Sequence, residues 1–115
     1  MKGQVEEINI KVMLDKNNIC QKIFWEASNS PDDGISESKA LALSLWDSQG
    51  RGTAKIDLWT QDMDVYEMKR FVIETIAGLA DTVRLATEDD VMAMELEILA
   101  QQMGRRLEKE LQANK

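Results

Sequence analysis

The sequence predicts an α+β fold in which a four-stranded antiparallel sheet, made of two hairpins, is followed by two C-terminal α-helices packed on one face. Three observations support this prediction. Residues 4–60 contain four stretches in which apolar and polar residues alternate, and turn-forming residues separate the members of each pair. Residues 64–111 repeat apolar residues at helical spacing instead. Strands and helices are therefore segregated along the chain.

The first predicted hairpin pairs residues 4–14 with residues 19–27, and both stretches alternate as half-buried strands do. The Asp-Lys-Asn-Asn sequence between them favours a turn, because Asp and Asn tolerate left-handed backbone and bond to their own main chain. Trp25 falls on the apolar face of the second strand, which predicts a core position.

The second predicted hairpin carries a tryptophan on each arm. Residues 39–47 have good helix propensity, but their leucines recur at period two and a turn follows. We therefore predict a strand there, with a helix as the alternative. Residues 53–60 form the matching strand. Trp46 and Trp59 each lie on the face opposite the leucines and isoleucine of their own strand.

Two helices are predicted after the hairpins. Asp64 is a strong N-cap, and Glu67 three residues later completes a capping box. Apolar residues then recur at helical spacing through residues 68–83. Thr87 is predicted to cap the second helix, with Asp90 at the box position. A partial heptad follows along this helix and could support self-association or simply pack on a sheet: Leu96, Leu99, Met103 and Leu107.

Length and charge limit the function classes. The 115 residues suit one domain, residues 1–115, and the net charge of −7 disfavours nucleic-acid and anionic membrane partners. No stretch approaches the ~20 apolar residues of a membrane helix, and the N-terminus lacks the apolar region of a secretory signal. The single cysteine, Cys20, forms no internal disulfide and suits a reducing compartment. We expect a cytoplasmic protein without membrane insertion.

The chain has no histidine, the commonest general base and metal ligand. We therefore expect no enzyme activity, catalytic residue, cofactor or metal. Asp57, Asp62 and Asp64 lie close along the chain and could form a carboxylate site for a divalent cation. The favoured interpretation is a strand residue, a loop residue and a helix cap, because capping explains Asp64.

The tryptophan hairpin is the best candidate for a contact surface. If helices cover the leucine face, Trp46 and Trp59 lie on the other face, and exposed tryptophan is enriched at binding hot spots. Asp47 and Arg51 in the intervening turn belong to the same candidate surface. Plain cross-strand packing of the two indoles is the competing interpretation.

Several short segments occur in one order along the chain: Leu-Ser-Leu-Trp-Asp at 43–47, Ile-Asp-Leu-Trp-Thr at 56–60, Met63, Glu-Met-Lys at 67–69, Ala-Asp-Thr at 80–82 and Ala-Thr at 86–87. This combination resembles the GldC family of gliding-motility-associated proteins over about residues 5–110. The resemblance implies a small, soluble, cytoplasmic accessory protein tied to bacterial gliding, and it supplies no catalytic residues.

Two hypotheses about function follow. The first is a non-enzymatic accessory or adaptor protein that acts through protein–protein contacts, with the motility machinery as the expected partner and a homodimer as an open possibility. The second is a small ligand- or divalent-metal-binding module without catalytic activity.

Overall fold

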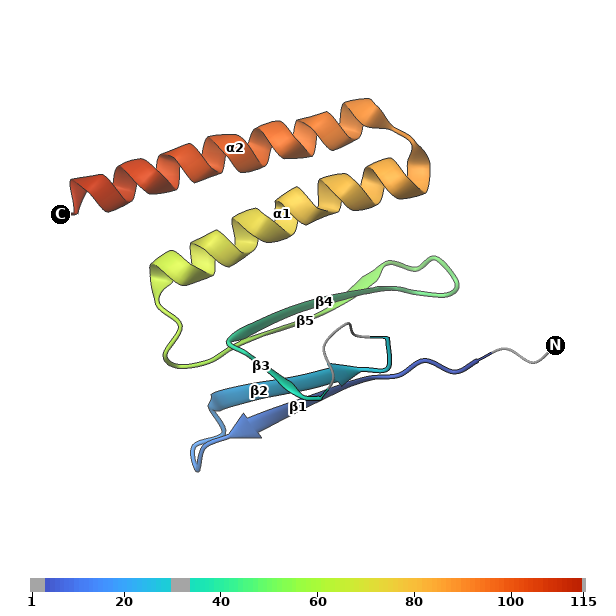
Figure 1. Cartoon of the computed structure of the whole chain (residues 1–115), viewed down its shortest axis with the longest axis vertical. Helices are drawn as coiled ribbons and strands as arrows, with labels where there is room; N and C mark the ends of the chain where they lie inside the picture. The colour runs from blue at the N-terminus through green and yellow to red at the C-terminus, as the bar shows by residue number, and fades with distance from the viewer. Residues whose placement is uncertain (1–3, 30–33, 115) are drawn as a thin grey trace. The chain divides into compact units, whose positions relative to one another are not determined.

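The computed structural model describes residues 4–29 and 34–114. The chain divides into two compact units, with the boundary between Met63 and Asp64. The first unit holds the described strands and the second holds the described helices (Figure 1). The α+β class is confirmed, but the single four-stranded sheet is wrong. In the described part of the chain, five strands form two separate antiparallel sheets, one of three strands and one of two.

The first sheet contains β1 (Ile8–Leu14), β2 (Cys20–Ala27) and β3 (Ser36–Ser38), in that order. The hairpin of β1 and β2 confirms the first predicted pair of strands. The third strand was not predicted, because Ser-Glu-Ser shows no apolar alternation and three residues are too few for a periodic signal. Its pairing with β2 comes from the tertiary fold.

The buried side of this sheet centres on Ile23, which is 1% exposed and pairs with Val12 on β1. Trp25 lies two residues further along β2 and is half-buried. Its indole Nε1 donates a hydrogen bond to Ser38 Oγ at 3.0 Å, so the tryptophan also ties β3 to β2. Cys20, at the start of β2, is a buried free thiol.

Residues 15–18 form the predicted turn. Asp15 Oδ1 accepts hydrogen bonds from the backbone N–H groups of Asn17 at 2.8 Å and Ile19 at 3.1 Å. Asn18 adopts a φ of 64°, in the left-handed region that Asn tolerates. The turn therefore uses the chemistry that its sequence indicates.

The second sheet is the hairpin of β4 (Ala40–Trp46) and β5 (Thr53–Trp59). The prediction of a strand over residues 39–47 is confirmed, since cross-strand pairing overrides the helix propensity of the Ala and Leu residues. One further backbone hydrogen bond, from Thr60 N to Lys39 O at 2.8 Å, extends the pairing beyond β5.

The second unit consists of α1 (Val65–Thr87) and α2 (Asp90–Ala113). Asp64 is the N-cap of α1, as predicted, and its Oδ1 accepts from Glu67 N at 2.7 Å. Among the described residues, no helix combines the length and the apolar character that crossing a membrane requires.

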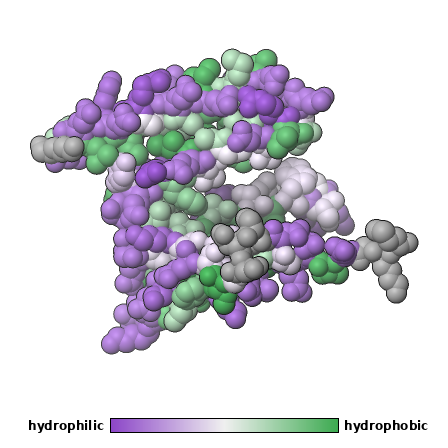
Figure 2. Space-filling view, in the orientation of Figure 1, coloured by the Kyte–Doolittle hydropathy of each residue, from purple (hydrophilic) through white to green (hydrophobic). Residues whose placement is uncertain are grey.

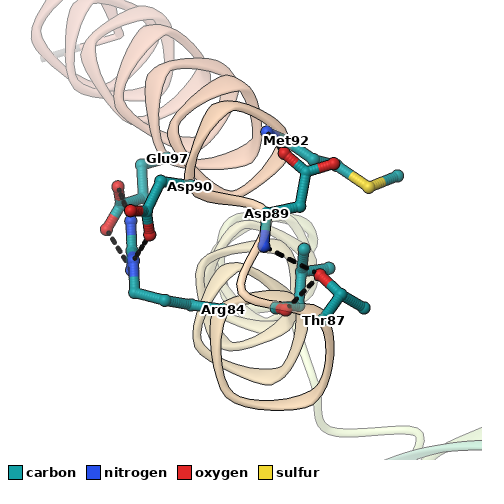
Figure 3. Close-up of polar contacts among 7 residues, drawn as sticks. Arg84, Thr87, Asp89, Asp90, Met92 and Glu97 are labelled. Atoms are coloured by element: carbon teal, nitrogen blue, oxygen red, sulfur yellow. Dashed lines mark hydrogen bonds and ion pairs between the residues drawn. The ribbon is translucent and has the colours of Figure 1, made fainter.

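The prediction that Thr87 caps α2 is wrong. Thr87 is the last residue of α1, and Asp89 caps α2 by accepting from Met92 N at 2.9 Å. The Thr87 hydroxyl donates to Val83 O and accepts from Asp89 N, so it joins the end of α1 to the connection (Figure 3). Thr and Asp are both good caps, and a two-residue shift lies within the usual uncertainty of helix ends.

Ion pairs link the two helices, which lie side by side (Figure 1). Arg84 Nη2 contacts Glu97 Oε1 at 3.0 Å and Arg84 Nε contacts Asp90 Oδ1 at 3.3 Å, near the connection (Figure 3). Lys69 Nζ contacts Glu110 Oε2 at 2.9 Å near the other end. These pairs place the helices antiparallel. The fully buried or nearly buried residues of the pair are mostly small: Ala80, Ala93, Ala100 and Leu107.

Candidate functional site

The two tryptophans of the second hairpin lie on one face of it. Trp46 pairs with Thr53, and Trp59 pairs with Ala40. Directly paired residues share a face, and every second residue of a strand returns to it, so both indoles are on the same side. Trp46 is 70% exposed and Trp59 is 55% exposed. This arrangement agrees with the alternation in the sequence.

The tryptophans stand at opposite ends of this face, which we call the tryptophan face. The six residue-to-residue steps from Thr53 to Trp59 correspond to about 20 Å along the strand. Between the indoles lie the pairs of Ser44 with Lys55 and of Ala42 with Asp57, and Lys55 Nζ contacts Asp57 Oδ2 at 3.4 Å. The tryptophan face therefore offers two separate aromatic anchors joined by a polar strip that is electrically neutral. It is defined by Ala40, Ala42, Ser44, Trp46, Thr53, Lys55, Asp57 and Trp59.

The opposite face of the hairpin carries the leucines. Leu41, Leu43 and Leu58 are half-buried there. Nearer the turn, Leu45 is 53% exposed and Ile56 is 47% exposed. Burial of this face therefore decreases toward the turn, and these two residues provide exposed aliphatic side chains for comparison with the indoles.

Asp47 and Arg51, predicted as contact residues, build the turn between the strands. Asp47 Oδ2 accepts from Gln49 N at 3.0 Å, from Arg51 N at 3.3 Å and from Arg51 Nε at 3.1 Å. Gly50 and Gly52 adopt φ values of 76° and 142°, which residues other than glycine rarely adopt. The Asp47 carboxylate is thus committed to the turn, whereas the Arg51 side chain remains 74% exposed.

These bonds give a pH prediction. The Arg51 side chain, followed by the backbone N–H groups of Arg51 and Gln49, lowers the pKa of Asp47. The pKa of Asp15 is lowered chiefly by the N–H of Ile19. A carboxyl with a lowered folded-state pKa stabilises the fold above its unfolded pKa of about 3.9, and this contribution is lost as the pH falls through the folded value.

We therefore expect the free energy of unfolding to stay nearly constant between about pH 6 and 8, where no histidine titrates, and to fall below about pH 4. Urea titrations at successive pH values measure this. Asp47→Asn should reduce the slope of the acid limb. A steep change near neutral pH, or an unchanged slope in the variant, would contradict the assignment.

The three aspartates proposed as a cation site have separate roles. Asp57 contacts Lys55 in the tryptophan face, and Asp64 caps α1. Asp62 Oδ1 accepts from Thr60 Oγ1 at 2.6 Å, and this bond lowers the pKa of Asp62. Within residues 4–29 and 34–114, no group of three or more potential ligand side chains is arranged to hold a metal ion. Capping and pairing explain these carboxylates individually.

The residues of the predicted self-association stripe on α2 differ in burial. Leu107 is 8% exposed and belongs to the contact between the helices. Leu99 is 44% exposed, whereas Leu96 and Met103 are half-buried. The four residues still lie on one side of α2, because steps of three and four residues return to nearly the same side of a helix, and burial increases across the stripe from Leu99 to Leu107.

A groove between the helices adds residues that the heptad on α2 did not identify. Its volume is about 250 Å³, and Met68 and Val72 of α1 face Met103 of α2 across it. At its edge, Glu110 accepts from Lys69 at 2.9 Å and lies 3.8 Å from Arg106, and Lys69 lowers the pKa of Glu110. The four-residue spacing of Met68 and Val72 indicates that they share one side of α1. Only the pairing of the helices shows that this side lines a groove.

Comparison with protein families identifies a related family. The family model described as gliding motility-associated protein GldC-like matches residues 20–109, which is most of the chain. Comparisons with curated proteins and with solved structures gave no significant match. The matched segment includes β2, the tryptophan hairpin, α1 and most of α2. The chain therefore belongs to the GldC-like family of gliding motility-associated proteins.

Proposed function

We propose that the protein is a cytoplasmic accessory protein of gliding motility that works through protein–protein contacts, with the tryptophan face as its contact surface. The observation that carries this proposal is the exposure of two tryptophans on one face of a hairpin. Large aromatic side chains exposed to water are unfavourable in a protein that acts alone, and tryptophan is the residue type most enriched at hot spots.

The partner that fits this face has two apolar pockets about 20 Å apart, one for each indole. Between the pockets it meets the neutral strip of Ser44, Lys55 and Asp57, where polar groups can form hydrogen bonds. This chemistry describes another folded protein with a moderately polar surface. It does not suit nucleic acid, because the chain is acidic overall and the strip has no excess of cations.

We also propose that the protein is not an enzyme. The chain lacks histidine, and the one thiol, Cys20, is buried within a strand. The carboxylates near the hairpin are engaged in a turn, an ion pair and a cap. These features leave few groups for general acid–base or nucleophilic chemistry.

The test replaces both indoles in the native cell. A Trp46→Ser, Trp59→Ser variant is expected to remain folded, because both side chains are exposed, but to lose its partner and reduce gliding. Loss of one such anchor typically costs about 2 kcal/mol or more of binding free energy, an affinity decrease of at least about thirtyfold. Cross-linking in live cells, identification of the linked motility protein, and colony spreading measure the two effects.

The matched control is Leu45→Ser with Ile56→Ser, which removes two exposed apolar side chains from the opposite face of the same hairpin. It should keep both the cross-link and gliding. Equal loss in both double variants would reject the tryptophan face, and so would normal gliding of the tryptophan variant. Circular dichroism of the purified variants must show unchanged folding.

The ligand-binding hypothesis has one observation in its favour, the groove that Met68, Val72 and Met103 line. A ligand that binds the native protein raises its midpoint of thermal unfolding. If this second function is correct, a screen of amphipathic carboxylates is expected to raise that midpoint, and Met103→Glu should remove the increase. No increase with any compound would reject it.

A further inference from the structure

The helix pair exposes a continuous apolar face that its own packing does not bury. The groove places Val72 of α1 and Met103 of α2 on the same side of the pair. Leu79 follows Val72 by seven residues and therefore shares its side, and Leu99 and Met92 precede Met103 by four and eleven. Figure 2 shows apolar residues gathered along the boundary of the two helices. We call this surface of the α1–α2 helical hairpin the hairpin face; it is distinct from both faces of the β4–β5 hairpin. Its members are Met68, Val72, Leu79, Met92, Leu99 and Met103.

Four members of the hairpin face are substantially exposed. The exposed fractions are 44% for Val72, 48% for Leu79, 51% for Met92 and 44% for Leu99. The contact between the helices instead buries the small residues Ala80, Ala93 and Ala100. Because alanines let the helices approach closely, the larger apolar side chains are displaced to one side. Two helices alone cannot bury such a face.

The size of the hairpin face matches a dimer interface. Helices of 23 and 24 residues are about 35 Å long, and two adjacent helices are about 20 Å wide. The whole side of the helix pair that carries the hairpin face therefore covers about 700 Å², close to the roughly 800 Å² that each partner contributes to a standard stable interface. A second copy of the chain offers the same area and the same apolar character.

The charges of the hairpin face also favour a second copy. Its charged neighbours are Lys69, Arg106 and Glu110 at one end, where Glu110 contacts both cations, and the exposed Glu95, three residues after Met92. The six residues of the face are uncharged, so two copies meet with few like charges between them, although each chain carries −7. A basic partner needs exposed carboxylates here, and an anionic lipid surface needs unpaired cations. Among the described residues, the hairpin face has one such carboxylate beside it, Glu95, and no unpaired cation.

We propose that two copies of the chain join their hairpin faces and form a four-helix bundle. Two-fold symmetry makes such an interface self-complementary. The steps of four, three and four residues from Met92 through Leu96 and Leu99 to Met103 are the spacing of a bundle core. This dimer forms through α1 and α2, whereas the tryptophan face lies on β4 and β5. A test of the dimer is therefore independent of the proposed contact with a motility partner.

The test is the mass of the full chain in solution, measured by light scattering after size exclusion. The native protein is expected to elute with the mass of two 13.1 kDa chains. Leu99→Glu should raise the dissociation constant of the dimer at least about a hundredfold, because it buries an unpaired charge at the centre of the interface. The matched control is Ile98→Glu. Ile98 is 48% exposed and Leu99 is 44% exposed, but Ile98 lies on another side of α2.

A dimer that Leu99→Glu dissociates and Ile98→Glu preserves supports the proposal. A monomeric native protein, a mass above two chains, or equal dissociation by both variants overturns it. Ellipticity at 222 nm checks that each variant retains its helices. Should Leu99→Glu lose ellipticity, Val72→Glu on α1 provides the same comparison, and a folded dimer of that variant overturns the proposal.

Discussion

Replacing Ile23 with alanine is expected to lower the free energy of unfolding by about 2–5 kcal/mol, the range for removal of a buried aliphatic side chain. Ile23 is 1% exposed and is the largest described side chain that is essentially fully buried. It pairs with Val12 on β1 and with Ser38 on β3, so it lies at the centre of the three-stranded sheet. Its loss leaves a cavity where all three strands meet.

Urea unfolding followed by tryptophan fluorescence measures this effect, since all three tryptophans lie in residues 1–63. The control is Ile8→Ala, which makes the same chemical change on β1 at a position that is 72% exposed. This control should cost less than about 1 kcal/mol. Similar losses for both variants would show that Ile23 is not the centre of this core.

Replacing Ala80 with leucine is the second large effect. Ala80 is fully buried on α1, and the ion pairs of Lys69 with Glu110 and Arg84 with Glu97 place it near the level of Ala100 on α2. The larger leucine side chain at this point must separate the helices or adopt a strained rotamer, which lowers the free energy of unfolding by about 1–3 kcal/mol. Leucine and alanine have similar helix propensities, so the loss reports packing.

Ellipticity at 222 nm during urea unfolding follows the helices and measures the loss. Ala77→Leu, three residues earlier and exposed, introduces the same atoms where there is space, and its stability should change by less than about 0.5 kcal/mol. If Ala77→Leu destabilised the protein as much as Ala80→Leu, the close approach of the helices at the alanines would be refuted.

Local chemistry made much of the fold predictable. The turn at Asp15, the cap at Asp64 and the glycine-containing turn after Asp47 each depend on residues within four positions of one another. The strand over residues 39–47 was predictable because period-two alternation and the following turn outweighed helix propensity. The shared face of Trp46 and Trp59 follows from the same alternation once the pairing register is known.

Other features depend on partners that are distant along the chain. β3 exists because Ser36 and Ser38 pair with Trp25 and Ile23, and its own sequence carries no strand signal. The role of Asp47 in its turn is a local feature that the sequence analysis did not identify. Asp47 was predicted to contact a partner, and the structure shows in addition that one of its carboxylate oxygens accepts from three donors of its own turn.

The sequence by itself determined the order of strands and helices, the turns, the first helix cap and the alternation that puts both tryptophans on one face, because each of these depends on neighbouring residues. Only the tertiary structure decided that the strands form two sheets, and that mostly alanines, together with Leu107, fill the contact between the helices. Apolar periodicity identifies which residues prefer burial. It does not identify which of them find a partner, because that depends on the distance between elements and on side-chain volume.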